Sequence, residues 1–469
     1  MIAPIIDLLL FFAITIPILG WLCEKIKRPY LCGVYTTIGL AISLWQVLLM
    51  EFPIKISQFS IDRLSGFMAI TFLMLGIFAS IFSMKYLERD TGIPLFYTLL
   101  VLMIIGMIGA VFAGDLFTLF VFWEMMCIAS YTLVAFRKEK WEPVEAAFKY
   151  LVMSSAGSAS MLFGISLIYG MCSTLNFTEI SKILIEPNIW VYIASIFIFI
   201  GLGVKSAIFP LHTWLPDAHS AAPSPISAML SGVVIETGVY AICRIGFSVL
   251  SYVKWLEVIA ILSILTMFIG NLTPLLQTDI KRLLAYSSIA HIGYMLAGIS
   301  TGTILGLTGT FMHIFNHATM KGLAFLCSGV ILYRLGTRDM REMMGIGRKM
   351  PITSTTLFIS LFALAGMPPL NGFISELTII LASIEANMIW LGIFMVINII
   401  ISVAYYLRIL KVFLQPITLK NIEEVREAPI IMLIPLVSLA ILIILFGIWP
   451  DGLMNYARNA AYELLRGVL

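Results

Sequence analysis

Long apolar runs recur along the whole chain, and they constrain its fold more than any other feature. A run of about 20 apolar residues crosses the roughly 30 Å hydrocarbon layer of a bilayer as a helix. Hydrophobic residues make up 60% of the 469 residues, charged residues 12%, and the mean hydropathy is +1.02. Soluble globular domains lie far from these values. The sequence therefore predicts an all-α polytopic membrane protein.

The apolar runs predict fourteen transmembrane spans and a single membrane domain over residues 1–469. The first run lacks the basic start and cleavage site of a signal peptide, so we expect it to be retained. The expected limits are 2–22, 30–50, 64–84, 94–113, 115–136, 144–170, 188–208, 224–248, 255–276, 282–300, 303–333, 352–384, 388–414 and 429–448.

Basic residues are distributed unevenly among the loops. The loops after even-numbered spans carry only Lys55, Arg63, Lys182 and Lys254. Loops with excess lysine and arginine face the cytoplasm. We therefore expect both termini on the outer side of the cell membrane. The loops after spans 1, 3, 5, 9, 11 and 13 carry Lys25, Lys27, Arg28, Lys85, Arg89, Arg137, Lys138, Lys140, Lys281, Arg282, Arg334, Arg338, Arg341, Arg348, Lys349, Lys420 and Arg426.

Six ionisable residues lie within apolar spans. A charge at the bilayer centre costs about 2.5–3.5 kcal/mol on insertion scales, so such residues indicate function. Because acids, lysines and a histidine are spread over six spans, they predict a polar axis for ion movement through the membrane. The six residues are Glu124, Lys205, Glu236, His291, Lys321 and Glu376.

Prolines interrupt spans 7 and 12, at Pro210 after Lys205 and at Pro368 and Pro369 before Glu376. Unwound backbone at membrane depth occurs only where protein or wet space surrounds it, and broken helices in matching halves mark ion sites. The interruptions are five spans apart. We therefore expect two repeats, over 94–248 and 255–414, each forming one half-channel, with the second copy inverted.

His212, Asp217 and His219 follow the first interruption, where we expect a loop on the cytoplasmic side. Together with the three prolines they are candidates for ion uptake or gating. The alternative, that these polar side chains only cap a re-entrant turn, stays open.

Structural interpretations stand beside the functional ones. Glu124 and Lys205 could form a buried pair that only joins helices, and Glu376 could cap the half-helix after its break, whose dipole favours an acid. Glu236 could pair with a basic neighbour, and His291 could be a packing residue. Lys149 and Arg244 lie nearer span ends, where snorkelling is the expected role.

We expect no metal site and no disulfide framework. His313, His317 and Lys321 share one helical face, but no third ligand is evident. The six cysteines are scattered and contain no CxxC pair. The chain also carries no flavin, haem, iron–sulfur or nucleotide motif, so no cofactor is expected and redox chemistry within this chain is not predicted.

Five stretches resemble one known family: "FWEMM", "GVKSAIFPLHTWLPDAHSAAPSPISAMLSG", "TDIKRLLAYSSIAHIGY", "FNHATMKGLAFLCSG" and "AGMPPLNGFISE". They are similar to the antiporter-like proton-translocating subunits of respiratory complex I, of Mrp-type cation/proton antiporters and of energy-converting membrane-bound hydrogenases. The resemblance extends from about Asp62 to Leu414. It implies fourteen helices with two inverted five-helix repeats.

The resemblance also implies roles for individual residues. Glu124 and Lys205 would form the ion pair of the first half-channel, and Glu376 would be the terminal protonatable residue. Glu236 departs from the family, since many relatives carry a lysine there. If the Glu124 carboxylate and the Lys205 ammonium lie about 4 Å apart, they attract each other by roughly 4 kcal/mol at an effective dielectric of about 20.

Together these features predict an ion-translocating membrane subunit of a multisubunit oxidoreductase or antiporter complex. Its expected partners are other membrane subunits, including further antiporter-like ones, lipid and, where the complex has one, a peripheral redox arm; no nucleic acid is expected. The transported ion, proton or sodium, stays open. So do two alternatives, a self-sufficient secondary antiporter and a non-pumping scaffold subunit.

Overall fold

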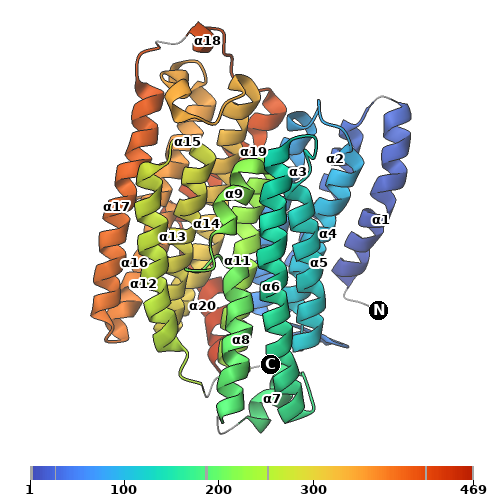
Figure 1. The fold of residues 1–469 in the computed structure, drawn as a ribbon, viewed down its shortest axis with the longest axis vertical. Helices are drawn as coiled ribbons and strands as arrows, with labels where there is room; N and C mark the ends of the chain where they lie inside the picture. The colour runs from blue at the N-terminus through green and yellow to red at the C-terminus, as the bar shows by residue number, and fades with distance from the viewer. Residues whose placement is uncertain (1–3, 27, 185–187, 251–252, 418–419, 467–469) are drawn as a thin grey trace.

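The protein is an elongated bundle of helices that lie side by side (Figure 1). The computed structural model describes residues 4–26, 28–184, 188–250, 253–417 and 420–466. Residues 2–3 of the first expected span and Lys27 of the first basic loop lie outside the described residues. The short helices α7 and α18 lie at opposite ends of the bundle in Figure 1.

Three apolar helices and a hairpin form the N-terminal part. The strands pair antiparallel, with Ile54 opposite Ile61. This hairpin, which lies between the second and third helices, was not expected from the apolar runs. The elements are α1 (Pro4–Lys25), α2 (Tyr30–Leu48), β1 (Ile54–Ile56), β2 (Phe59–Ile61) and α3 (Arg63–Tyr86).

The next group of elements covers the first expected repeat. One π-helical turn, η1, continues from α10 into α11. Gly201 of α8 packs so closely on α6 that a Cβ there would lie 2.5 Å from the Gly157 carbonyl oxygen. Small residues at helix contacts allow this approach. The elements are α4 (Ile93–Phe112), α5 (Leu116–Val134), α6 (Trp141–Cys172), α7 (Phe177–Ile183), α8 (Ile189–Lys205), α9 (Trp214–Ala221), α10 (Ser224–Met229), η1 (Leu230–Val234) and α11 (Ile235–Ser248).

The remaining elements cover the second expected repeat and the C-terminal part. The last helix, α20, buries Ala457, Ala460 and Ala461 and contacts α3, α11 and α14. These elements are α12 (Leu256–Leu272), η2 (Thr273–Leu276), α13 (Ile280–Ser300), α14 (Ile304–Leu335), η3 (Met340–Met343), η4 (Ile346–Arg348), α15 (Pro351–Leu364), α16 (Asn371–Glu385), α17 (Ile389–Leu414), α18 (Lys420–Glu423), α19 (Ile430–Ile448) and α20 (Asp451–Arg466).

Every expected span coincides with helix. Twelve helices of the described chain are long and apolar enough to cross a membrane, and α8 and α15 are shorter apolar helices. Helix α8 coincides with expected span 7, and α15 together with α16 coincides with expected span 12. The expected spans are therefore helical, and the length and composition of the described helices support twelve crossings, so the count of fourteen stays a prediction.

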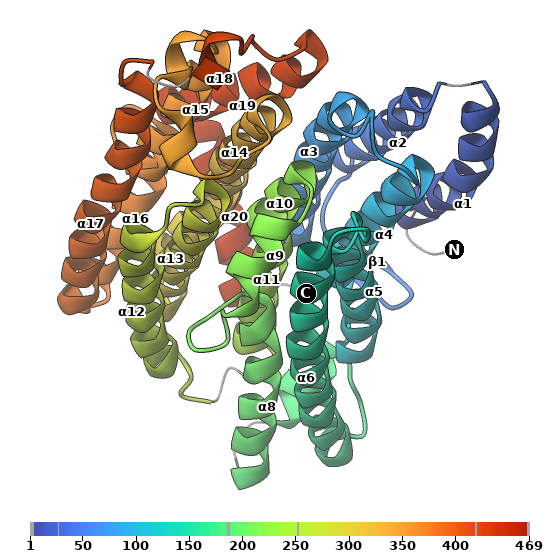
Figure 2. The same ribbon diagram turned by 45° about the horizontal axis from the view of Figure 1, so that its top comes forward.

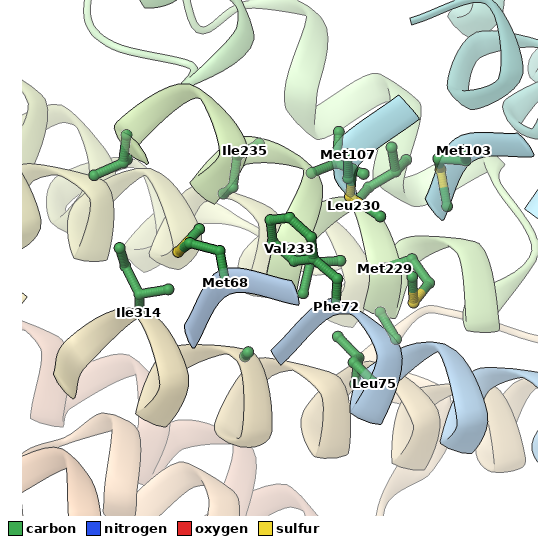
Figure 3. Close-up of a cluster of buried hydrophobic side chains, with 14 of the residues drawn as sticks. Met68, Phe72, Leu75, Met103, Met107, Met229, Leu230, Val233, Ile235 and Ile314 are labelled. Atoms are coloured by element: carbon green, nitrogen blue, oxygen red, sulfur yellow. The ribbon is translucent and has the colours of Figure 1, made fainter. Parts of the chain in front are cut away.

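Helix α14 lies at the centre of the bundle. It contacts α3, α10, α13, α15, α16, α19 and α20. Figure 3 shows the apolar part of this centre, where Met68, Phe72 and Leu75 of α3 meet Val233 of η1 and Ile314 of α14. The polar face of α14, which carries His313, His317 and Lys321, is therefore surrounded by neighbouring helices and is buried. Figure 2 shows α14 flanked by α13 and α20.

The expectation that Arg244 snorkels is wrong. Its side chain is 2% exposed, and its Nη2 atom lies 2.6 Å from Oδ2 of Asp62. Asp62 also caps α3 by accepting a hydrogen bond from the Ser65 backbone N–H. A guanidinium so far inside the protein needs a fixed counter-charge, and this pair joins α11 to the start of α3.

Candidate ion-translocation site

Helix α8 ends at Lys205 without direct help from the prolines. Ala207 has a left-handed φ of 52°, and the Ile208 N–H donates to the Gly203 carbonyl at 3.0 Å. This closure satisfies carbonyl groups that the end of a helix leaves free. Pro210 follows only after the helix has stopped, so it prevents continuation and does not break an existing turn.

The Lys205 ammonium lies among neutral polar groups. Its Nζ is 2.6 Å from the Tyr150 hydroxyl and 3.4 Å from both Ser130 Oγ and Cys127 Sγ. The Lys205 side chain is 2% exposed. Three groups from α5 and α6 therefore solvate the buried amine.

The expected contact between Glu124 and Lys205 is absent. Within the described residues, no acidic oxygen lies within 4.0 Å of the Lys205 ammonium, and Glu124 instead accepts a hydrogen bond from Ser158. Cys127, one turn after Glu124 on α5, occupies the place beside the lysine. The pair is therefore not closed in this conformation, and its role as a switch stays a prediction.

Trp214 closes the first interruption. Its indole N–H donates to the Val204 carbonyl at 2.8 Å, and its ring stacks on Tyr150 at 3.9 Å between centroids. Neither aromatic residue was predicted from the sequence. A signal was present on α6, where Tyr150, Ser154 and Ser158 recur every four residues and thus share one face.

The candidates after the first interruption lie mainly in helix, so the expected loop is wrong: Asp217 and His219 belong to α9. Asp217 accepts hydrogen bonds from Arg282 and, at 3.1 Å, from Lys149. His219 is buried and stacks on Phe325 of α14, while both of its ring nitrogens lack a hydrogen-bond partner. His212 is also buried, in the turn before α9, and its Nδ1 is unpartnered.

Glu236 and His317 form a buried pair at the centre of the protein. The Glu236 Oε1 and His317 Nδ1 atoms are 2.7 Å apart, and neither side chain is exposed. The expected basic neighbour of Glu236 is thus a histidine of α14. One turn further along α14, Lys321 donates to the Leu284 carbonyl at 3.1 Å and to the Ser287 hydroxyl, both on α13.

Two histidines and Glu376 meet where α13, α14 and α16 converge. His291 Nδ1 lies 3.0 Å from His313 Nε2 and 3.9 Å from Glu376 Oε1. The His291 ring also lies 5.2 Å, between centroids, from that of His317. His291, His313 and Glu376 are all residues of types that ligate metals, and this cluster contains His313 but not His317.

The second interruption repeats the helix ending of the first. Gly366 has a φ of 66°, and the Met367 N–H donates to the Phe362 carbonyl at 3.0 Å. Helix α16 begins after Pro368 and Pro369, at Asn371, whose carbonyl accepts a hydrogen bond from Asn316 at 2.8 Å. A Cβ at Gly366 would lie 2.3 Å from Glu376 Oε2, so glycine allows the acid to approach the break.

The predicted residues thus fall into two groups. Glu236, His291 and Glu376 belong to one buried series, which His317 and His313 complete, while Lys321 lies one helical turn away from it. Lys205 lies outside this series. Short steps between titratable groups suit proton transfer along the series, whereas passage from Lys205 to Glu236 needs water or a movement of side chains.

Sequence families match most of the chain. The family described as "NADH:quinone oxidoreductase/Mrp antiporter, TM" matches residues 113–402. The family described as "NADH-Ubiquinone oxidoreductase (complex I), chain 5 N-terminus" matches residues 45–97. The first match contains both interruptions and all six ionisable residues of the apolar spans.

Individual relatives match over nearly their whole length. The chain is 31% identical to F(420)H(2) dehydrogenase subunit N of Methanosarcina mazei, covering 92% of this chain and 91% of the relative. It is 32% identical to NADH-quinone oxidoreductase subunit N of Coxiella burnetii, covering 96% of each.

A solved structure shows the same fold. A chain of the membrane-bound sulfane sulfur reductase, an archaeal respiratory membrane complex, superposes with a TM-score of 0.90 at 29% identity, covering 99% of this chain and 97% of that one. Together with the twelve apolar helices, this likeness makes the protein a multi-pass membrane protein. The chain belongs to the NADH:quinone oxidoreductase/Mrp antiporter family of membrane subunits.

Proposed function

We propose that the chain is the ion-translocating membrane subunit of a multisubunit complex. One observation carries this proposal: the buried series from Glu236 through three histidines to Glu376, with Lys321 beside it. Desolvating so many ionisable groups is costly, and a purely structural bundle would be as stable with apolar side chains in their places.

The relatives support a role within a larger assembly. Two of them carry names of dehydrogenase or oxidoreductase subunits, and the third belongs to a respiratory membrane complex. In our proposal this chain likewise works beside other membrane subunits, which include further antiporter-like chains. A peripheral redox arm or an existing ion gradient supplies the energy.

Each interruption serves one half-channel in this proposal. Residues 94–248 form the first, with Lys205 as carrier, Glu124 as its switching partner, and Pro210, His212, Asp217 and His219 at the uptake side. Residues 255–414 form the second, with Pro368 and Pro369 at the break and Glu376 as the terminal group. The basic loops support a cytoplasmic position for the end that carries α18, with both termini outside.

The absent contact between Glu124 and Lys205 fits a switch in its open setting. When the acid moves toward the lysine, attraction between the two charges stabilises the ammonium; when it withdraws, that attraction is lost. Glu124 is half-buried and is held by the Ser158 hydroxyl, which permits exchange between two partners. Proton movement accounts for these groups directly, and sodium exchange is a second outcome of the transport assay.

Lys205→Ala tests the proposal. In vesicles containing the whole complex, we expect normal assembly but no coupled ion movement, because the first carrier is gone. Lys182→Ala, an exposed lysine on α7, is the matched control and should transport normally. Coupled transport that persists in Lys205→Ala would refute the mechanism, and transport by the purified chain alone would favour a self-sufficient antiporter.

A further inference from the structure

Three side chains that can ligate a metal ion converge where α13, α14 and α16 meet. They are His291 Nδ1, His313 Nε2 and a carboxylate oxygen of Glu376, and all lie within 4.8 Å of one another. From these positions we propose that the second half-channel contains a binding site for a borderline divalent cation of the Zn²⁺ class.

The distances between the donors suit zinc. Zinc binds nitrogen and oxygen ligands at about 2.0–2.2 Å in a tetrahedral arrangement, which places neighbouring donors on the order of 3.4 Å apart. The His291 Nδ1 to His313 Nε2 distance is 3.0 Å, and His291 Nδ1 to Glu376 Oε1 is 3.9 Å. Small side-chain shifts therefore close the site, and a fourth position remains for water.

The Glu376 carboxylate supports a ligand independently of the histidine geometry. Its side chain is buried, and its Oε1 atom has no hydrogen-bond partner although it is directed at His291. A buried carboxylate oxygen without a donor is costly. A cation held between this oxygen and the two imidazoles satisfies it.

Hydrogen bonds outside the site orient both imidazoles. His313 Nδ1 lies 2.9 Å from Ser375 Oγ, so its Nε2 is the nitrogen that faces the other donors. His291 Nε2 lies 3.4 Å from the Tyr406 hydroxyl, which leaves Nδ1 facing them. Metal-binding histidines characteristically use their second nitrogen in this way.

The donor set and charges select the class of cation. Two imidazoles and one carboxylate favour zinc and similar transition metals, whereas sodium, magnesium and calcium prefer oxygen ligands. Glu236, beyond the His317 ring, contributes a second nearby acid, while the charge of Lys321, about two turns from His313 along α14, opposes binding. Binding requires the hydrogen bond between His291 and His313 to break. The histidine that donates this bond then carries its proton on its other ring nitrogen, which leaves both facing nitrogens free for the cation.

Binding itself does not depend on the proposed transport, but its consequence rests on that proposal. Zinc at these three donors occupies the groups next to the terminal acid of the second half-channel. In our proposal, occupancy therefore blocks ion passage at the second interruption and leaves the surroundings of Lys205 unchanged.

The test uses the purified whole complex, equilibrated for hours with Zn²⁺ because the donors are buried. Zinc content is measured by elemental analysis, and ligand identity by X-ray absorption at the zinc edge. The variants are His313→Gln and, as a second route should that one not assemble, His291→Gln. His212→Gln removes a histidine elsewhere and controls for other zinc bound by the complex.

We expect the first two variants to hold one zinc fewer per chain than the wild type and His212→Gln. Loss of a residue that only hydrogen-bonds to a metal ligand lowers metal affinity by about 10- to 100-fold. Loss of a ligand itself should lower the zinc affinity of this site by more than that. Equal zinc content in wild type and His313→Gln overturns the site, as does an absorption spectrum without imidazole. If the wild type binds zinc at these residues but Lys205→Ala still transports ions, the zinc site stands and only the proposed function is refuted.

Discussion

At the first interruption a lysine lies among hydroxyls and a thiol, whereas at the second a glutamate lies beside two histidines. Both helices nevertheless end in the same way, with a residue of positive φ, Ala207 or Gly366, and a matching pair of backbone hydrogen bonds. The same backbone device therefore presents a cation in one half and an acid in the other.

The side chains that hydrogen-bond to the backbone at the two interruptions also differ. At the first, the Trp214 indole N–H donates to a carbonyl in the last turn of α8, whereas at the second the Asn316 amide donates to the first carbonyl of α16. Because Trp214 stacks on Tyr150, the first closure is linked to the group that holds Lys205. The second closure lies beside Ser375, which orients His313. Tyr150 thus links the first interruption to Lys205, and Ser375 links the second to His313.

Replacing the acid at the second interruption should give the largest effect. Glu376→Gln keeps the size of the side chain but cannot release a proton, so we expect transport by the complex to fall about 100-fold or more. Glu385→Gln, an exposed acid at the end of the same helix, is the control. Normal transport in Glu376→Gln would mean that the two interruptions do not share a carrier function.

Removing one hydroxyl tests how the first interruption holds its cation. Tyr150→Phe deletes the 2.6 Å contact to Lys205, and a hydrogen bond to a charged group contributes about 1.5–3 kcal/mol. We expect the free energy of unfolding, measured by detergent denaturation, to fall by that amount. Tyr131→Phe removes a neighbouring hydroxyl while keeping its ring against Tyr150, and it should change little.

The smallest expected effect is a difference between two coupling energies. Contacting residues couple by about 0.5–3 kcal/mol, whereas separated ones add within about 0.5 kcal/mol. A double-mutant cycle of His291→Gln with Glu376→Gln should therefore show coupling in the unfolding free energy. The cycle of Glu124→Gln with Lys205→Met should show almost none. Strong coupling in the second cycle would place the resting state in the closed setting of the switch.

Much of the molecule follows from the sequence. Apolar runs placed every span on a helix, because hydrocarbon forces each crossing segment to satisfy its own backbone. The two interruptions were visible as Pro210 and Pro368. The buried ionisable residues were equally visible, since a charged or polar residue inside an apolar run stands out from its neighbours.

What the sequence left undecided is which of these groups touch. Lys205 lies with Tyr150 and not with Glu124, and Arg244 lies with Asp62, which precedes it by 182 residues. Glu376 reaches His291 across a boundary between helices. Periodicity along one helix gives the face on which a side chain lies, but the rotation and depth of neighbouring helices determine its partner. Those are fixed only by packing of the whole bundle.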